Sequence, residues 1–342
     1  MNVKKKRITA AGPLAAGGHI TTRRLFNTAL LGAATLAAVP PAWAANEPPI
    51  HMLVGFPAGG GSDVIARLLA EKLEKALDRS VVVENRPGAG GQIAAQQLKA
   101  ARPDGTTVFL SHDHTISILP QVIKKPGYAP QSDFAPLGGF ATFVNGLAVS
   151  PGTPAKTVPE YVEWVKSQGG KSAVGIPAPA STPEFLVQLI AKRYGLDLVA
   201  VPYKGSAPMM ADMLGNQIPA GVGSVQDFIE YQRAGKLRMI GVLGGARQAA
   251  VPDVPTFSEL GFKGLEDTPF YGIWAPKGTP AAFVTRFSRA LDSVVAVPDV
   301  RKQLTDLGLT VDTMSPAQLA KREQAYTKGW SRIIRDSGFQ PQ

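Results

Sequence analysis

Apolar residues along the chain fall alternately into short runs and into longer stretches with helical spacing. Residues 50–54 (IHMLV) are a short apolar run, which predicts a strand, and residues 64–77 keep their apolar side chains at helical spacing. The same order follows at residues 81–84 and 92–101. Tandem units of strand and helix predict a parallel sheet covered by helices, which is an α/β fold.

A glycine-rich loop joins strand to helix in both units. The first loop is GFPAGGGSD at residues 55–63, and the second is NRPGAGG at residues 85–91. Right-handed crossovers place both loops at the carboxyl edge of a parallel sheet, so we expect the two helix N-termini to face one crevice. A helix N-terminus presents free N–H groups and a partial positive charge, which favours a carboxylate or phosphate. Glycines that serve only tight turns are the alternative explanation.

Polar residues follow the third predicted strand, residues 107–110. Ser111, His112, Asp113 and His114 come directly after it and would lie at the same sheet edge. Two histidines two positions apart can share a strand face and bind a metal, but the sequence offers no further ligand nearby. We therefore predict no metal site, and interpret these residues as polar loop residues or as hydrogen-bonding partners of a ligand.

The alternation continues through the second half of the chain. Strands are predicted at residues 173–176, 198–201, 222–225, 239–243 and 271–276. Helices are predicted at residues 158–168, 182–194, 298–307 and 316–336, with shorter ones ending at 214 and 234 and a long one opening at 278–280.

No long linker or low-complexity block separates these units, so we predict two interleaved lobes. The first lobe takes residues 45–143 plus 246–342, and the second takes residues 144–245. The chain would cross between them near residues 143–146 and 244–246.

Composition narrows the class of protein. The 342 residues include 36 Lys and Arg and 26 Asp and Glu, a net charge of +10. Six of the basic residues precede Glu47, the first acidic residue, and without those six the charge is +4. A small excess with mixed signs gives no clustered basic face, so we predict no nucleic-acid partner. The absence of Cys excludes disulfides, iron–sulfur clusters, thiolate zinc sites and a cysteine nucleophile.

The first 44 residues have the features of an export signal. A basic stretch precedes the apolar run 29–39 and the small-residue sequence AWA at 42–44, and the run is too short to span a bilayer. Arg23 and Arg24, followed by Leu25 and Phe26, resemble the twin-arginine signature. We expect a mature chain beginning near Ala45 in a bacterial periplasm, without a stable membrane anchor. An ordinary secretory leader with two adjacent arginines is the alternative.

Signals for catalysis or for nucleotide binding are weak. Only three histidines follow the leader, and Ser224 lacks the flanking glycines of a nucleophile elbow. An enzyme would have to use Ser111 or Ser224 with a distant His. The first glycine loop has neither a Gly-Lys-Ser/Thr ending nor the dinucleotide spacing, so we predict no cofactor.

Five ordered segments resemble one known family, the tripartite tricarboxylate transporter substrate-binding proteins, also called Bug proteins. They are FPAGGGSD at 56–63, VENRPGAGG at 83–91, PDG at 103–105, VPYKGSAP at 201–208 and APKGTP at 275–280. The resemblance implies a two-lobed periplasmic binding protein of type II with a ligand cleft between the lobes. It also implies that both glycine loops grip one carboxylate through backbone amides, and that the protein delivers a small organic carboxylate to the membrane permease subunits of such a transporter.

One segment departs from the family pattern. Residues 175–184 read GIPAPASTPE, with Glu184 where the family usually has a histidine. Only Ser181 of this segment carries over as a ligand contact. The departure suggests a ligand whose far end is not a typical second carboxylate.

The sequence therefore predicts a monomeric, non-catalytic periplasmic receptor, with a periplasmic hydrolase or a solute sensor on the same fold as alternatives. Asp63 would cap its helix or receive a ligand amine or hydroxyl, and Phe56 and Tyr203 would contact the ligand unless they belong to the lobe cores. The predicted ligand-binding residues are Phe56, Pro57, Ala58, Gly59, Gly60, Ser62, Asp63, Gly88, Ala89, Gly90, Ser111, Asp113, Ser181, Tyr203 and Ser224.

Overall fold

The computed structural model of the protein describes residues 47–263, 267–337, 339 and 341, all of which belong to one unit, Asn46–Gln342. The predicted leader, residues 1–44, lies outside the described residues. Among the helices that these residues form, none combines the length and the apolar composition needed to cross a membrane.

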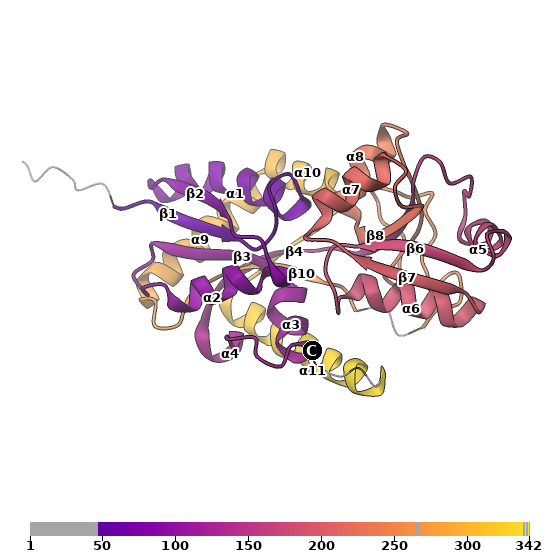
Figure 1. The fold of residues 1–342 in the computed structure, drawn as a ribbon. Helices are drawn as coiled ribbons and strands as arrows, with labels where there is room; N and C mark the ends of the chain where they lie inside the picture. The colour runs from indigo at the N-terminus through magenta and orange to yellow at the C-terminus, as the bar shows by residue number, and fades with distance from the viewer. Residues whose placement is uncertain (1–46, 264–266, 338, 340, 342) are drawn as a thin grey trace, which may run out of the picture. The chain divides into compact units, whose positions relative to one another are not determined.

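The first of two sheets has six strands in the order β11-β4-β10-β3-β1-β2 (Figure 1). Strands β1, β2 and β3 are parallel, and β10 and β11 pair antiparallel with β4. Their bounds are β1 Ile50–Val54, β2 Val81–Asn85, β3 Thr107–His112, β4 Phe134–Thr142, β10 Phe270–Pro276 and β11 Thr310–Met314.

Alternate residues of this sheet enter two different cores, as the period of two along a strand requires. Met52 and Val54 pack with helices α1, α9 and α10 on one face, whereas Leu53 packs with α2, α3 and α11 on the other. The helices around the first sheet are α1 Gly61–Leu77, α2 Gln92–Ala100, α3 Leu119–Val122, α4 Pro130–Asp133, α9 Ala281–Ala296, α10 Pro298–Asp306 and α11 Pro316–Ser337, with the short turns η1 Ala89–Gly91 and η2 His114–Ile118.

The second sheet has five strands in the order β7-β6-β8-β5-β9, of which β6, β7 and β8 are parallel (Figure 1). One continuous apolar core joins this sheet to its helices. The bounds are β5 Asn145–Val149, α5 Val158–Ser167, β6 Lys171–Ile176, α6 Thr182–Tyr194, β7 Asp197–Pro202, α7 Ser206–Leu214, β8 Ala220–Ser224, α8 Val225–Arg233 and β9 Arg238–Val242.

Two segments connect the sheets. The first is short, because only Phe143 and Val144 separate β4 from β5. After β9 the chain remains with the second sheet: Val251, Phe257 and Phe262 lie in its core. We therefore propose that the return crossing lies between Phe262 and Phe270, later than the predicted 244–246.

The fold class predicted from the sequence, a two-lobed α/β protein, is confirmed. Strand β3 is longer than predicted, so Ser111 and His112 belong to the strand itself. The sequence analysis did not predict strands β4, β5 and β11. These segments become strands through pairing with partners distant in sequence, which periodicity does not reveal.

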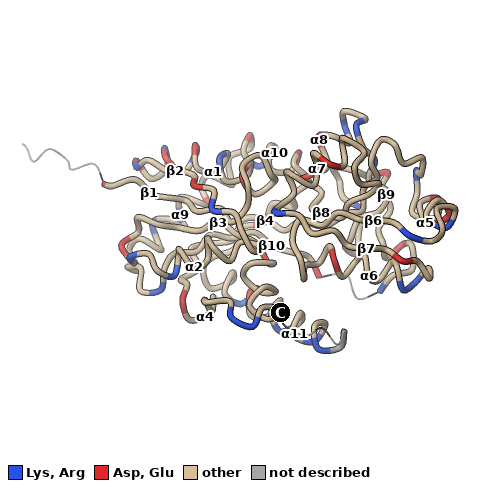
Figure 2. The backbone as a smooth tube through the Cα atoms, viewed as in Figure 1, with Lys and Arg blue, Asp and Glu red and all other residues tan. Residues whose placement is uncertain are grey.

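Charged side chains of both signs are interspersed along the described chain (Figure 2). The exposed ion pairs join residues that are near one another on the surface, such as Arg247 with Glu259. Pairs of this kind add about 0 to 1 kcal/mol each to stability, so the fold rests mainly on its buried apolar cores.

Candidate functional site

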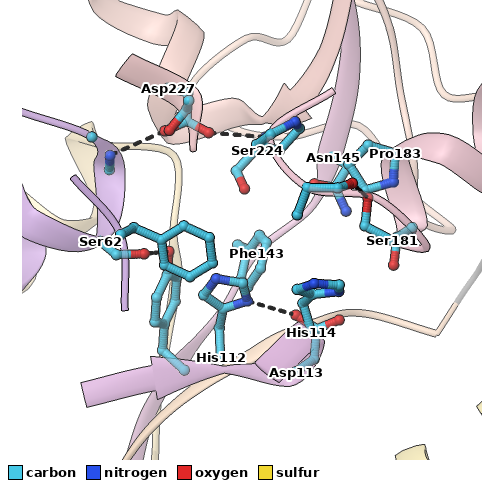
Figure 3. A pocket seen from close by; sticks show the side chains of 18 of the residues that line it. Ser62, His112, Asp113, His114, Phe143, Asn145, Ser181, Pro183, Ser224 and Asp227 are labelled. Carbon is cyan, nitrogen blue, oxygen red and sulfur yellow. Dashed lines mark hydrogen bonds and ion pairs between the residues drawn. The ribbon is translucent and has the colours of Figure 1, made fainter. Parts of the chain in front are cut away.

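A cavity of about 50 Å³ is lined by residues of both lobes (Figure 3). Its walls come from the β1–α1 loop, the end of β3 and β10 on the first sheet, and from the β6–α6 loop and the N-termini of α7 and α8 on the second. The sequence predicted seven of its lining residues: Phe56, Pro57, Gly60, Ser62, Asp113, Ser181 and Ser224.

Twelve further lining residues are not among the predicted ligand-binding residues, although the sequence analysis named His112 and His114 as possible hydrogen-bonding partners of a ligand. Some of them carry signals that could have found them: Asp227 stands three residues after Ser224 in a helix-start pattern, and His114 is in the polar run after β3. The twelve are Gly61, His112, His114, Phe143, Asn145, Pro177, Ala178, Thr182, Pro183, Ser206, Asp227 and Tyr271.

Aromatic rings enclose His112 on one side of the cavity. The Phe56 ring stacks on the imidazole with 5.0 Å between centroids, and the rings of Phe143 and Tyr271 meet it edge-on at 5.8 and 5.5 Å. Phe56 and Tyr271 come from distant elements, the β1–α1 loop and β10. The arrangement gives the cavity an apolar wall with a polar imidazole edge.

Asp113 has hydrogen-bond partners, whereas the adjacent His114 has none among the described residues. The hydroxyl of Tyr326 donates to the Asp113 carboxylate at 3.0 Å, and His112 Nδ1 lies 3.3 Å from it. Neither ring nitrogen of the buried His114 has a hydrogen-bond partner among the described residues. Burial lowers the pKa of His114 to about 4, and the nearby His112 adds a smaller contribution in the same direction. The His114 imidazole is therefore neutral at neutral pH.

The second glycine loop lines a neighbouring cavity of about 190 Å³ instead of the first. Gly88, Ala89, Gly90 and Tyr203 line this second cavity, and Phe56 lines both. Gly55 and Phe56 of the first loop also line this second cavity, so the two glycine loops meet there, whereas the first loop alone lines the first cavity.

Local packing around Gly90 fixes the position of the second loop. Thr115 donates to the Gly90 carbonyl at 2.8 Å, and a Cβ on Gly90 would come within 2.6 Å of His114 Nε2. These contacts hold the second loop against η2. In the second cavity the Tyr203 hydroxyl donates to Asp212 at 2.7 Å, and burial together with this bond raises the pKa of Tyr203 to about 12.

Four predicted residues line neither cavity: Ala58, Gly59, Asp63 and Ser111. Ala58 and Gly59 are exposed at the outer turn of the first loop, and Ser111 is buried within β3.

Asp63 supports the first loop from outside the cavity. Its carboxylate accepts hydrogen bonds from Gly59 N–H at 2.9 Å, from Arg67 at 3.0 Å and from Asn85 at 2.9 Å. Burial alone would raise the pKa of Asp63, but these three donors lower it below its ordinary value. The predicted helix cap is wrong in detail: the N-cap of α1 is Gly60, without a side-chain cap hydrogen bond, and Asp63 is the third residue of the helix, binding back to the loop.

Glu184, at the position of the family's usual histidine, also faces its own loop. The Ala180 N–H donates to the Glu184 carboxylate at 2.5 Å, which closes the turn before α6. The Ser181 hydroxyl donates to the Ala178 carbonyl at 2.6 Å and lines the cavity. Within the described ranges, no group of three or more His, Cys, Asp or Glu could hold a metal ion.

Two α/β lobes with a cavity lined from both are the architecture of periplasmic binding proteins. A sequence model described as "Tripartite tricarboxylate transporter family receptor" matches residues 65–339, and the chain belongs to this family. A UPF0065 protein of Cupriavidus necator is 32% identical over 312 residues, which cover 91% of this chain and 94% of that protein.

Solved structures agree with this assignment. The periplasmic binding protein BugD superposes with a TM-score of 0.82 at 31% identity, over 86% of this chain and 99% of its own. An R. palustris protein solved with adipate has a TM-score of 0.82 at 26% identity, over 88% and 100% of the two chains. MatC of Rhodopseudomonas palustris, solved with bound malate, has a TM-score of 0.78 at 28% identity, over 84% and 99%.

The family consists of substrate-binding receptors, and its structurally known members include periplasmic binding proteins. The resemblance seen in the sequence is therefore confirmed, and with it the choice of a receptor over a hydrolase.

Proposed function

We propose that the protein is a periplasmic receptor that closes its two lobes over a small organic carboxylate and hands it to the permease of a tripartite tricarboxylate transporter. The observation that carries the proposal is the cavity between the lobes, lined from both lobes and by the N-termini of four helices. The adipate and malate complexes of its relatives support a carboxylate as ligand.

Helices α1, α6, α7 and α8 begin at this cavity, at Gly61, Thr182, Ser206 and Val225. Their N–H groups and dipoles favour negative charge by about 0.3 to 2 kcal/mol each. Micromolar binding requires about 8 kcal/mol, so the helix ends orient the ligand and leave most of the affinity to other contacts. Apolar and hydrogen-bond contacts made when the lobes close, with Phe56 and Phe143 as walls, supply the remainder.

The proposal includes export through the twin-arginine leader and action as a monomer. A sensor that reports the ligand to a signalling protein would share the same cavity, and a transport assay separates the two roles. Loss of uptake of the bound acid on deletion of the gene, with gene expression unchanged, supports delivery to a permease.

A thermal-shift panel of di- and tricarboxylates, aromatic acids and hydroxy acids tests binding. A ligand at 100 times its Kd stabilises the folded state by about 2.7 kcal/mol, which appears as a higher melting temperature. We expect at least one small carboxylate to stabilise the wild type, while neutral analogues do not. A panel in which no carboxylate raises the melting temperature contradicts the proposal.

A matched pair of glycine variants localises the effect. Gly60 lines the cavity, and a Cβ there would lie 3.2 Å from Ser206 Oγ, so Gly60→Val should abolish the stabilisation. Gly245 is exposed, and a Cβ there would meet no atom within 4 Å, so Gly245→Val should respond to ligand as the wild type does. Equal responses of the two variants would place the ligand elsewhere.

A further inference from the structure

The carboxylate of Asp227 lies between the two lobes and is bound by both. Its Oδ1 accepts hydrogen bonds from the Gly61 N–H at 3.0 Å and from the Ser206 hydroxyl at 2.7 Å, and its Oδ2 accepts one from the Ser224 N–H at 3.2 Å (Figure 3). Gly61 begins α1 of the first lobe, whereas Ser206 and Ser224 belong to the second. One side chain thus joins the N-termini of two facing helices, α1 and α8.

The contact depends on the glycine at position 61. A Cβ there would come within 2.6 Å of Gln226 Cγ and 2.8 Å of Asp227 Oδ1, so only glycine permits this approach. Beside it, the Gln226 side-chain amide donates to the Tyr271 hydroxyl at 2.9 Å, and that hydroxyl is 3.1 Å from Ser62 Oγ. The start of α8 is therefore docked on the start of α1 by several polar contacts.

This contact between α1 and α8 limits the charge of a ligand that can bind in the cavity. The amide that opens α1, where a ligand carboxylate was expected, already binds the Asp227 side chain. Burial raises the pKa of Asp227, and the hydrogen bonds that it accepts from Ser206, Gly61 and Ser224 act against this rise. A second carboxylate, Asp113, also lines the cavity, and none of the described lining residues is Lys or Arg. Of the two lining histidines, His114 lacks a hydrogen-bonding partner among the described residues.

We propose that Asp227 sets the charge of the ligand: it fills the anion position at the α1 N-terminus and repels a second carboxylate, so the receptor takes acids with one carboxylate in preference to the corresponding dianions. The inference rests on the proposed function and narrows its ligand class. The other end of the ligand would be neutral and able to donate a hydrogen bond toward Asp113 or Asp227.

Isothermal titration with matched acids tests this inference. Succinate, glutarate and adipate are compared at pH 7.5 with their monoamides, which keep the length and shape of each acid and remove one charge. We expect the wild type to bind the best-fitting monoamide at least tenfold more tightly than its dianion. In Asp227→Asn, which keeps the shape of the side chain, the preference should fall to about threefold or less.

Glu230→Gln is the matched control, because it neutralises an exposed carboxylate of the same helix, α8, that lines neither cavity. It should retain the tenfold preference of the wild type. Should Asp227→Asn fail to fold, Asp227→Ser serves in its place. The ratio of the wild-type affinities for monoamide and dianion tests the inference without any variant.

The outcomes separate the two proposals. Binding of a dianion at least as tightly as its monoamide by the wild type, or an unchanged preference in Asp227→Asn, overturns the role of Asp227 and leaves the receptor function standing. Binding of neither acid of any pair, together with a negative carboxylate panel, overturns the proposed function and this inference with it.

Discussion

Two buried groups in the first lobe should give opposite pH dependences to the stability of the fold. Burial lowers the pKa of His114 from its ordinary 6.5 to about 4, and burial raises the pKa of Glu323 from its ordinary 4.5 to about 7. Glu323 on α11 accepts a hydrogen bond from the indole N–H of Trp274 at 3.2 Å. Each group is therefore neutral in the folded protein over a pH range in which it is charged in the unfolded chain.

The signs follow from where the proton is held. His114 contributes its full stability above pH 6.5 and loses it as the pH falls toward 4, because the unfolded chain binds a proton that the folded protein does not. Glu323 contributes its full stability below pH 4.5 and loses it as the pH rises through 7, because the folded protein retains a proton that the unfolded chain releases. Between pH 4.5 and 6.5 the two slopes cancel.

The magnitude follows from the width of that window. At about 1.4 kcal/mol for each pH unit, each group changes the free energy of unfolding by about 3 kcal/mol between pH 4.5 and 6.5. Removing one group exposes the slope of the other. As the pH rises from 4.5 to 6.5, we expect the free energy of unfolding of Glu323→Gln to increase by about 3 kcal/mol relative to wild type. That of His114→Asn should decrease by about as much.

Urea unfolding followed by tryptophan fluorescence at several pH values measures these differences. Comparing each variant with the wild type at the same pH removes the contributions of all other titrating groups. The double variant is the control, since its stability should run parallel to that of the wild type. If the free energies of unfolding of Glu323→Gln and wild type differ by a constant amount from pH 4.5 to 6.5, the reasoning for both groups is refuted.

The remaining predictions concern the cavity and the leader. Gly60→Ala should leave the urea midpoint nearly unchanged but weaken ligand binding measured by calorimetry, since its backbone φ of −82° suits any residue while the Cβ narrows the cleft. Gly90→Ala, at φ +65° and against a buried side chain, should lower stability by at least about 1 kcal/mol in the same unfolding assay; equal stabilities of the two variants would contradict the contrast. Tyr271→Phe removes a hydroxyl shared between the lobes and should reduce the free energy of unfolding by about 1 kcal/mol, whereas no loss would show that these bonds add nothing. Replacing Arg23 and Arg24 together with Lys should stop export, as judged by fractionation, and unimpaired delivery would indicate the ordinary secretory route.

Much of the fold was predictable because several of its elements carry their own signal. The helix predicted at residues 182–194 forms with those bounds, and so does the strand at 50–54. Both have dense apolar patterns with clear punctuation, Thr182-Pro183 at the helix start and Gly195 just after its end. Strand β4 has no such pattern: it contains Pro136, Gly138 and Gly139, and it forms because β10 and β11 flank it. Its partners are more than 120 residues away in sequence, beyond the reach of local periodicity.

The cavity shows the same division between local and distant causes. Phe56 was predicted because it follows a strand and precedes a helix, which places it at the carboxyl edge of a sheet, whereas Ser181 was predicted from the resemblance to the family. The sequence also contained a sign that Asp227 begins a helix, since it stands three residues after Ser224.

What the sequence could not show is that the Asp227 carboxylate reaches Gly61, 166 positions earlier in the chain. Glycine loops and helix ends predict that an anion will be held, because the free N–H groups are a local property of the backbone. Which anion is held depends on how the lobes meet, and at the α1 N-terminus it is one that the protein supplies itself. The charge of the ligand is therefore decided by a tertiary contact, and a titration with matched mono- and dianions measures it directly.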